Sequence, residues 1–489
     1  MVIGNANPRP AAKKSPQALP VETDTPKYPR GRLAAAMSGA LLVMFAVVEG
    51  DFADASAVGA SLKNGASLQA QNWPVQTCND TTSPGSLRYI AVHANSGDTI
   101  DFSQLPTLCG MTNSTITLTA GEIVLHQPEI TLIGPSLGAK TVTLSGGGQS
   151  RVLRHATYTP SIGELRIYRL NLVNGYAFSP ASIGGGCVYS DANIHLYRSL
   201  VEGCTTHSAD GSSYGGGLHA PNGNISIVSS KVSGNTATVD SNGNAQGGGA
   251  ASLTFDSKYS EIIGNNVYGG IAGFGQGAGV RTKQLAMGYS TVGYNYSDLW
   301  GGGIFVGGGD LMVSSSSFYG NHSVAQGGAI RSIGNNLSIS NSTIAANSTD
   351  ADSGAGVYFD GTSAVVESTV VARNASTGMS SGTDFYLKSG MLSGADNAIM
   401  SSNADLPGFI VVTDDPKLAP FAWTGGPTRT IDLRLGSPAV GRGSNANNRT
   451  NDQRGIGFPR TTGPTNAVDI GAIQQTDRIF VSDLEGFFL

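Results

Sequence analysis

The sequence predicts an all-β fold, a right-handed parallel β-helix of roughly ten coils with an N-terminal helical cap and a C-terminal capping domain. A glycine cluster recurs seven times, and an apolar residue follows each cluster at the same offset. Successive clusters begin 31, 32, 30, 24, 26 and 27 residues apart. A period of this length is typical of a solenoid, in which each repeat forms one coil. The clusters begin at Gly184, Gly215, Gly247, Gly277, Gly301, Gly327 and Gly354.

Two columns of residues follow the clusters when these are aligned on their last small residue. The first column is apolar in every repeat, and the second is mixed and often polar. Because strand side chains alternate between the two faces, the first column is expected to point into the core and the second outward. The first column consists of Cys187, Leu218, Ala250, Val280, Ile304, Ile330 and Val357.

The second half of each repeat carries a Ser-x-apolar pattern, and an Asn follows three positions later. The Asn residues at this offset are Asn235, Asn265, Asn295, Asn321 and Asn347. Cys204 takes the Asn place in the first repeat, and Asn374 stands one residue late in the last. Asn tolerates left-handed backbone, and its amide can bond a neighbouring coil, so we expect a structural ladder of stacked Asn side chains at a turn.

The composition favours turns and strands and gives no sign of a nucleic-acid partner. The chain has 489 residues, of which 68 are Gly and only 13% are charged, against roughly 7% Gly and about 25% charged residues in average proteins. The net charge is −5, and no run of Lys or Arg lies within the repeats. Binding to a phosphate backbone requires such a run, so nucleic acid is not expected as a partner.

Residues 1–55 are typical of a secretory signal peptide with a long basic leader. An apolar run over 33–48 follows the basic residues, and a small-x-small pattern then predicts cleavage after Ala55. The run is shorter than the roughly 20 residues that a spanning helix needs, so a retained membrane anchor is the weaker alternative. We therefore expect an exported chain, extracellular or on the outer cell surface, without a transmembrane span after cleavage.

The four cysteines are Cys78, Cys109, Cys187 and Cys204. An even number in an exported chain predicts two disulfides, with the pairing left open and buried free thiols as the alternative. No Cys or His spacing is typical of zinc, and we expect neither a metal site nor a cofactor; bound calcium is conceivable on the fold but no residue pattern supports it.

Composition and repeat boundaries divide the chain into five expected segments. The signal peptide over 1–55 is followed by a linker and cap over 56–110, the coils over 111–400, a capping domain over 401–475 and a tail over 476–489. An amphipathic helix, with Ser86 as its N-cap, is expected in the front cap. Covers are expected because the ends of an open stack expose unpaired strand edges.

Two groups of motifs resemble a known family. The first resembles the opening of bacterial exported right-handed β-helix proteins of the pectin-lyase-like superfamily. It comprises Cys78-Asn79-Asp80, Gly85-Ser86-Leu87-Arg88, Gly97-Asp98-Thr99-Ile100-Asp101, Cys109, Ile116-Thr117-Leu118, Gly121-Glu122-Ile123 and Leu132-Ile133-Gly134-Pro135. The resemblance implies export and a β-helix, but no defined activity.

The second group resembles the choice-of-anchor Q domain, which closes β-helices and precedes varied surface-sorting tails. It comprises Leu418-Ala419-Pro420, Gly425-Gly426-Pro427-Thr428, Leu435-Gly436-Ser437-Pro438-Ala439-Val440, Asp452-Gln453-Arg454-Gly455, Arg460 and Val468-Asp469-Ile470-Gly471-Ala472-Ile473. The chain departs from this family at Gly441 and Gln474, where members usually carry an acid. Any role of those acids in holding the cap or a cation is weakened here.

The second column supplies the candidate ligand-binding residues. Aromatic faces pack on sugar rings, and Arg offers fork-like donors to carboxylates. A row of such residues would suit an extended polysaccharide or a host or cell-surface glycan, including an acidic one. The alternative is an ordinary exposed sheet face, since the same residue types favour strands. The candidates are His219, Arg281, Phe305, Arg331 and Tyr358, the last four on successive coils.

No residue is assigned a catalytic role, although the superfamily includes pectate lyases and polygalacturonases. Glycoside hydrolysis usually needs two carboxylates roughly 5–9.5 Å apart. Asp350 and Asp352 lie in a variable loop, and Asp414 and Asp415 lie outside the repeats. We therefore expect an adhesion or glycan-contact protein without catalysis. The alternatives are a polysaccharide lyase or glycoside hydrolase, and a purely structural surface protein; the oligomeric state stays open.

Overall fold

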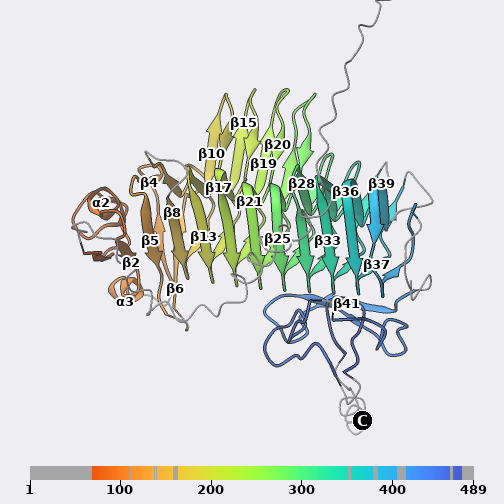
Figure 1. Cartoon of the computed structure of the whole chain (residues 1–489). Coiled ribbons are helices and arrows are strands. Elements are labelled where there is room, and N and C mark those ends of the chain that lie inside the picture. The colour runs from red at the N-terminus through yellow and green to blue at the C-terminus, as the bar shows by residue number, and fades with distance from the viewer. Residues whose placement is uncertain are drawn as a thin grey trace, which may run out of the picture. The chain divides into compact units, whose positions relative to one another are not determined.

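The computed structural model describes residues 69–475 except 111–112, 137, 139, 158–162, 351–353, 378–383, 405–414, 446 and 463–465. Within these residues the chain forms a parallel β-solenoid, which confirms the predicted fold class (Figure 1). Sheet B contributes one strand per coil and contains eleven strands in this part of the chain, slightly more than the predicted number of coils. The signal peptide and the tail over 476–489 lie outside the described residues.

Four parallel sheets run along the described stack, and each strand pairs with the equivalent strand of the next coil. Sheet A contains β1 (Asn72–Pro74), β2 (Thr99–Asp101), β4 (Ile123–Leu125), β5 (Glu129–Ile133), β7 (Leu153–His155), β8 (Glu164–Tyr168), β12 (Val188–Ser190), β13 (Asn193–Tyr197), β17 (Leu218–Val228), β21 (Ala250–Lys258), β25 (Val280–Gly288), β28 (Ile304–Gly307), β29 (Leu311–Ser314), β32 (Ile330–Ile333), β33 (Asn336–Ser340), β36 (Val357–Glu367) and β39 (Phe385–Ser393). Sheet B contains β3 (Asn113–Thr117), β6 (Thr141–Ser145), β9 (Asn171–Val173), β14 (Leu200–Glu202), β18 (Lys231–Ser233), β22 (Glu261–Ile263), β26 (Thr291–Gly293), β30 (Ser317–Tyr319), β34 (Thr343–Ala345), β37 (Val370–Ala372) and β40 (Ala398–Ile399).

The two smaller parallel sheets lie between sheet B and the next turn of sheet A. Sheet C contains β10 (Tyr176–Ser179), β15 (Thr205–Ser208), β19 (Thr236–Val239), β23 (Asn266–Tyr268), β27 (Tyr296–Ser297), β31 (His322–Ser323), β35 (Ser348–Thr349) and β38 (Ala375–Ser376). Sheet D contains β11 (Ile183–Gly184), β16 (Ser213–Tyr214), β20 (Ala245–Gln246) and β24 (Gly275–Gln276). Each sheet D strand follows a sheet C strand, and together they form a projecting arm (Figure 1).

The arms explain why the repeat length is not constant. Intervals of 30–32 residues contain a sheet C strand, a loop and a sheet D strand. In the intervals of 24 and 26 residues the chain turns back soon after β27 or β31, and isolated bridges at Trp300 and Gln326 continue the line of sheet D. Small side chains fill the space inside the arms; they include Ala237, Val239, Ala245, Val267 and Ala278.

The inward column is confirmed from Leu218 to Val357, and these six residues are at most 1% exposed. In the first repeat the prediction is wrong by one residue, because Val188 and not Cys187 pairs with Leu218; Cys187 takes the place opposite Gly217 and is also buried. All seven predicted residues belong to one continuous apolar cluster that extends from the N-terminal helix to the last coils. Burial of each aliphatic side chain stabilises the fold by about 1.5–3 kcal/mol.

The Asn ladder is present as expected. Asn265 Nδ2 donates to Asn295 Oδ1 (3.0 Å) and to the Val232 carbonyl oxygen (3.1 Å), and its own Oδ1 accepts from the backbone and side-chain nitrogens of Asn235. The same pattern continues along the stack to Asn374, whose nitrogens donate to Asp384 Oδ1. Every member therefore satisfies buried polar groups on a neighbouring coil.

A parallel ladder of hydroxyls fixes the turn between sheets A and B. The Ser260 backbone nitrogen donates to Ser290 Oγ (3.2 Å), and Ser290 Oγ donates to the carbonyl oxygen two residues earlier. Thr369 occupies the Ser position of a later coil, since Ser342 N donates to Thr369 Oγ1. The expectation that Asn374 stands one residue late is therefore wrong: counted from Thr369, its offset is the normal one.

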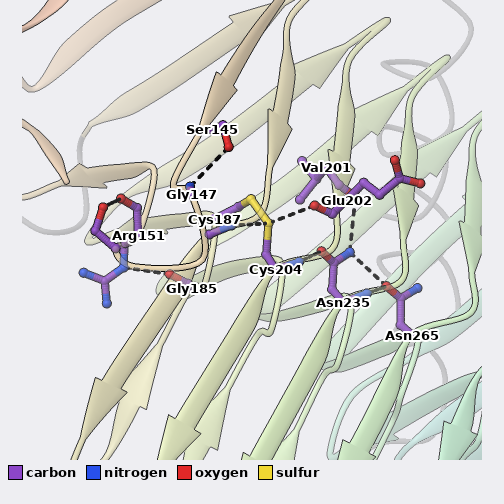
Figure 2. The surroundings of a disulfide bond; sticks show 12 residues. Ser145, Gly147, Arg151, Gly185, Cys187, Val201, Glu202, Cys204, Asn235 and Asn265 are labelled. Atoms are coloured by element: carbon purple, nitrogen blue, oxygen red, sulfur yellow. Dashed lines mark hydrogen bonds between the residues drawn. A yellow bond between two sulfur atoms is a disulfide. The ribbon is translucent and has the colours of Figure 1, made fainter. Parts of the chain in front are cut away.

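Both disulfides are formed, and the alternative of free thiols is wrong. Cys78 pairs with Cys109, and Cys187 pairs with Cys204. Cys204 stands at the head of the Asn ladder, where its backbone nitrogen donates to Asn235 Oδ1 (3.0 Å) and its sulfur accepts from Gly175 N (3.4 Å) (Figure 2). This disulfide joins the residue before β12 to the turn before β15.

Two short helices precede the main coils. In α2 (Leu87–His93) the Ser86 hydroxyl accepts from the Tyr89 backbone nitrogen, as the sequence predicted, and Leu87 and Ile90 join the core. The second helix is α3 (Leu105–Leu108). No helix in the described part of the chain is long and apolar enough to cross a membrane.

The C-terminal segment lies along the outer face of sheet B. It contains the antiparallel pair β41 (Leu418–Ala422) and β42 (Thr430–Leu433). Arg429 binds the buried Glu261 of β22, Gln453 Nε2 donates to Thr291 Oγ1 (2.9 Å), and Ala472 N donates to Thr343 Oγ1 (3.0 Å). These contacts attach the segment to several coils; the additional role of an end cap stays a prediction.

Replacement of Asn265 by Ala is expected to lower the free energy of unfolding by about 3 kcal/mol or more, because donors on Asn235 lose their buried acceptor. The matched control is the adjacent, partly exposed Asn266, whose replacement should cost below about 0.5 kcal/mol. Urea unfolding followed by circular dichroism measures both. Equal midpoints for the two variants would contradict a stabilising role of the ladder.

Candidate functional site

The five predicted ligand-binding residues stand in one register column of sheet A. Arg281 pairs with Phe305, Phe305 with Arg331, and Arg331 with Tyr358. His219 belongs to the same column, with Ala251 between it and Arg281. The column also continues at both ends, to Tyr189 and Tyr386. The structure therefore brings all five candidates into one column, four of them on successive coils.

A second column faces the first across each glycine turn. It follows sheet D and its bridges, and each member precedes its partner in the first column by five residues. The members are Gly184, Tyr214, Gln246, Gln276, Trp300 and Gln326. We name the two columns together the glycine corner.

The glycine turn is what brings the two columns together. Gly277 has φ +61°, and a Cβ there would stand 2.2 Å from the Val280 carbonyl oxygen. A side chain would therefore be strained by both the backbone conformation and the space. Because the chain reverses at this point, side chains five residues apart meet outside the core.

Four coils place a side-chain pair across the corner. Arg281 Nε donates to Gln276 Oε1 (3.3 Å), and Arg331 Nε donates to Gln326 Oε1 (3.1 Å). In other coils rings meet instead, with 5.3 Å between the centroids of Tyr214 and His219.

Contacts between coils join these pairs into a continuous stack. The guanidinium carbons of Arg281 and Arg331 lie 5.0 and 5.2 Å from the centroid of the Phe305 ring. Arg331 also lies 4.3 Å from the Trp300 ring and 5.4 Å from that of Tyr358. Such cation–π contacts contribute about 0.5–2 kcal/mol each.

The stack leaves the candidate residues less exposed than a free sheet face would be. His219, Phe305 and Tyr358 are 9%, 2% and 5% exposed, and the two arginines are half-buried. The reason is the register: neighbours stand only about 4.8 Å apart along the stack, and the second column covers one side. Ring faces are therefore largely used within the protein. The two arginines are more exposed than the rings, but Arg281 Nη1 donates to the Thr282 carbonyl oxygen and Arg331 Nη1 is buried.

Burial also shifts the pKa values of the ionisable side chains in the glycine corner. It lowers the pKa of Arg281 and of Arg331, although Tyr214 and Tyr358 respectively favour their charged forms. Burial, with a smaller contribution from Arg151, lowers the pKa of His219 to about 3, so this ring is neutral near pH 7. The His219 ring lies against Gly184, where a Cβ would stand 1.8 Å from its Nδ1 atom.

Exposed apolar residues of the arms were missed by the sequence analysis. Phe178 is 54% exposed, Tyr268 43% and Ile271 92%. Phe274 is 38% exposed, and its ring lies 5.2 Å from that of Trp300. The longer spacing of the first repeats was the available signal, since the additional residues form the arms.

The acids that were considered for catalysis are engaged in other contacts where the structure describes them. Asp350 lies 3.3 Å from His322, and Asp415 accepts a forked contact from Arg373. Asp352 and Asp414 lie outside the described residues. Burial raises the pKa of Asp256, Asp298 and Asp384.

The described residues contain no group of three His, Cys, Asp or Glu side chains arranged to hold a metal ion. Two histidines without an evident partner in the sequence have an acidic neighbour in the fold. His207 Nε2 lies 2.9 Å from Asp240, and His195 Nε2 lies 3.9 Å from Glu164.

Comparison with known proteins gives one structural similarity. The crystal structure of a pectate lyase, Pel9A, aligns with a TM-score of 0.42 and 10% sequence identity, covering 83% of this chain and 96% of that chain. No family model matches the sequence. No curated protein matches it either.

The unfolding free energy is expected to fall as the pH falls below 6.5. Between pH 6.5 and about 3 the unfolded chain binds a proton on His219 that the folded chain does not, so this group lowers stability by at most about 1.4 kcal/mol per pH unit. His219→Phe keeps a ring in the corner and removes this titration. Urea midpoints measured from pH 7 to pH 4 should fall less steeply for this variant than for the wild type.

The control is His93→Gln, which changes an exposed histidine and should keep the wild-type slope. An unchanged slope in His219→Phe would show that His219 takes up a proton in the folded chain as readily as in the unfolded one.

Proposed function

We propose that the chain is an exported surface or secreted protein that contacts an extended polysaccharide or cell-surface glycan through the glycine corner, without catalysis. The observation that carries the proposal is the continuous column of arginines and aromatic rings on successive coils. A row of this kind repeats charged donors on alternate coils, which suits a ligand that also repeats along its length.

Two features support export. Residues 1–55 have the pattern of a signal peptide, and both cysteine pairs form disulfides, which persist mainly in oxidising compartments. The resemblance of residues 401–475 to the choice-of-anchor Q domain points to the cell surface as the destination.

Partly exposed arginines define the kind of contact. Since the rings of Phe305 and Tyr358 are buried, the arginines are the groups that a ligand would meet, and a guanidinium donates more strongly to a carboxylate than to a neutral acceptor. Within the glycan class this favours a polymer that carries acidic groups along its length.

The Arg281→Gln, Arg331→Gln double variant should reduce retention of an acidic polysaccharide about ten-fold or more, because two charged donors are lost. The measurement is pull-down of the purified mature chain on a panel of acidic and neutral polymers. The charge-matched control is Lys283→Gln with Lys388→Gln, which removes two exposed charges from other positions of β25 and β39. Equal retention by both double variants would contradict a role of the corner.

The same panel is assayed for new reducing ends and unsaturated products, with calcium and with a chelator. Cleavage of any polymer would replace the proposal with a polysaccharide lyase or glycoside hydrolase. If no polymer is retained or cleaved, a purely structural surface role is favoured.

A further inference from the structure

A pocket of about 300 Å³ opens beside the first arm, outside the residues that the sequence analysis selected. This volume is at the lower end of the range for small-molecule sites. The pocket is lined by Glu122, Gln149, Ser150, Arg151, Tyr176, Ala177, Phe178 and Ile183. These residues come from the turn before β4, the loop after β6 and the strands β10 and β11.

Arg151 is held in a fixed position at the wall of the pocket. Its Nε donates to the Gly185 carbonyl oxygen (2.7 Å), its Nη2 donates to the Gly184 carbonyl oxygen (2.9 Å), and its Nη1 binds Glu122 (Figure 2 shows Arg151 and Gly185). The Arg151 side chain is only 10% exposed. The acid and the base therefore neutralise each other, and the lining carries no net charge.

Tyr176 is oriented by a histidine and an acid behind it. Its hydroxyl oxygen lies 3.1 Å from His207 Nδ1, and His207 Nε2 lies 2.9 Å from Asp240 Oδ2, off the direction of a straight hydrogen bond. In the tautomer with the proton on Nε2, the nitrogen that faces Asp240, Nδ1 accepts from the Tyr176 hydroxyl. The phenol oxygen then keeps its lone pair to accept a hydrogen bond from a ligand.

Phe178 adds an apolar surface at the mouth of the pocket. The ring is 54% exposed, and its centroid lies 5.2 Å from that of His207 in an edge arrangement that holds it in place. Ala177 and Ile183 add apolar atoms to the lining, and Glu122 and Gln149 add polar ones. A ring face combined with several hydroxyl acceptors suits a molecule that has both a C–H face and many hydroxyls.

We propose that this pocket binds one or two sugar units of a neutral saccharide, with the ring stacked on Phe178 and hydroxyls donating to Tyr176 and Glu122. The proposal rests on the proposed glycan contact and assigns it a site for the neutral units. The pocket also adjoins the glycine corner: the guanidinium of Arg151 lies 5.6 Å from the ring of Tyr189, which belongs to the first column. A chain whose neutral unit occupies the pocket can therefore continue along the corner.

The test measures binding of neutral disaccharides and uronic acid disaccharides to the full mature chain by saturation-transfer NMR and calorimetry. Wild type should bind at least one neutral disaccharide and bind the uronic acid forms more weakly. Phe178→Ala and Tyr176→Phe should each weaken that binding about ten-fold, whereas Tyr268→Ala and Tyr268→Phe should not, since Tyr268 is a comparably exposed arm residue outside the pocket. Circular dichroism melting checks that all variants are folded.

Absence of binding to every neutral disaccharide, or equal binding by the pocket and Tyr268 variants, would overturn the pocket assignment. Preference for uronic acid disaccharides would overturn its neutral specificity. Polymer retention separates this failure from that of the proposed function. If the pocket variants retain acidic polymer and the double arginine variant does not, the glycine corner binds the polymer and the pocket does not contribute to that binding. If the double arginine variant retains polymer while the pocket variants lose disaccharide binding, the pocket is supported as a saccharide site and the proposed polymer contact through the glycine corner is wrong.

Discussion

The register between successive coils is the constraint on which the rest of the structure depends. Each strand satisfies its backbone groups on the coils above and below, and the Ser and Asn ladders do the same at two turns where a strand cannot. These turn bonds are fully buried, so a slipped coil would leave amides such as those of Asn265 without partners. Residues from equivalent positions in successive repeats are therefore held about 4.8 Å apart. A residue type that recurs at one position of the repeat consequently forms a continuous column along the stack.

The same constraint limits what a column can bind. Large residues at this spacing contact one another before they contact a ligand, as the two arginines on either side of Phe305 show. Regular repetition therefore stabilises the glycine corner. At the same time it covers the faces of the aromatic rings with neighbouring side chains, so a ligand cannot reach them. Space for a ligand arises where repetition stops: on the arms, which only some coils possess, and at the end of the column near Arg151.

Interactions local to one repeat were predictable from the sequence, and interactions between distant segments were not. The Asn ladder, and the inward column after its first member, follow from spacing and residue type. The cysteine count predicted two disulfides, but their pairing was left open. The pairing of Arg281 with Gln276 required knowledge that the glycine turn folds back on itself. The contact of Glu261 with Arg429 joins residues 168 apart, and neither residue carries a local signal of the other. Tyr176, His207 and Asp240 are likewise brought together only by coil stacking.

The position of the pocket has a physical cause in the second column. On the next coil the equivalent position is Tyr214, but at Gly184 no side chain fits because the His219 ring occupies the space of its Cβ. With no side chain there, the carbonyl oxygens of Gly184 and Gly185 remain accessible to Arg151, which in turn holds Glu122. A larger residue at Gly184 would displace His219 and remove the support of Arg151 together. Gly184, which ends the second column, therefore also fixes the positions of Arg151 and Glu122 at the pocket. The position of the proposed binding site thus depends on the repeated glycine turn of the fold and not on an inserted loop.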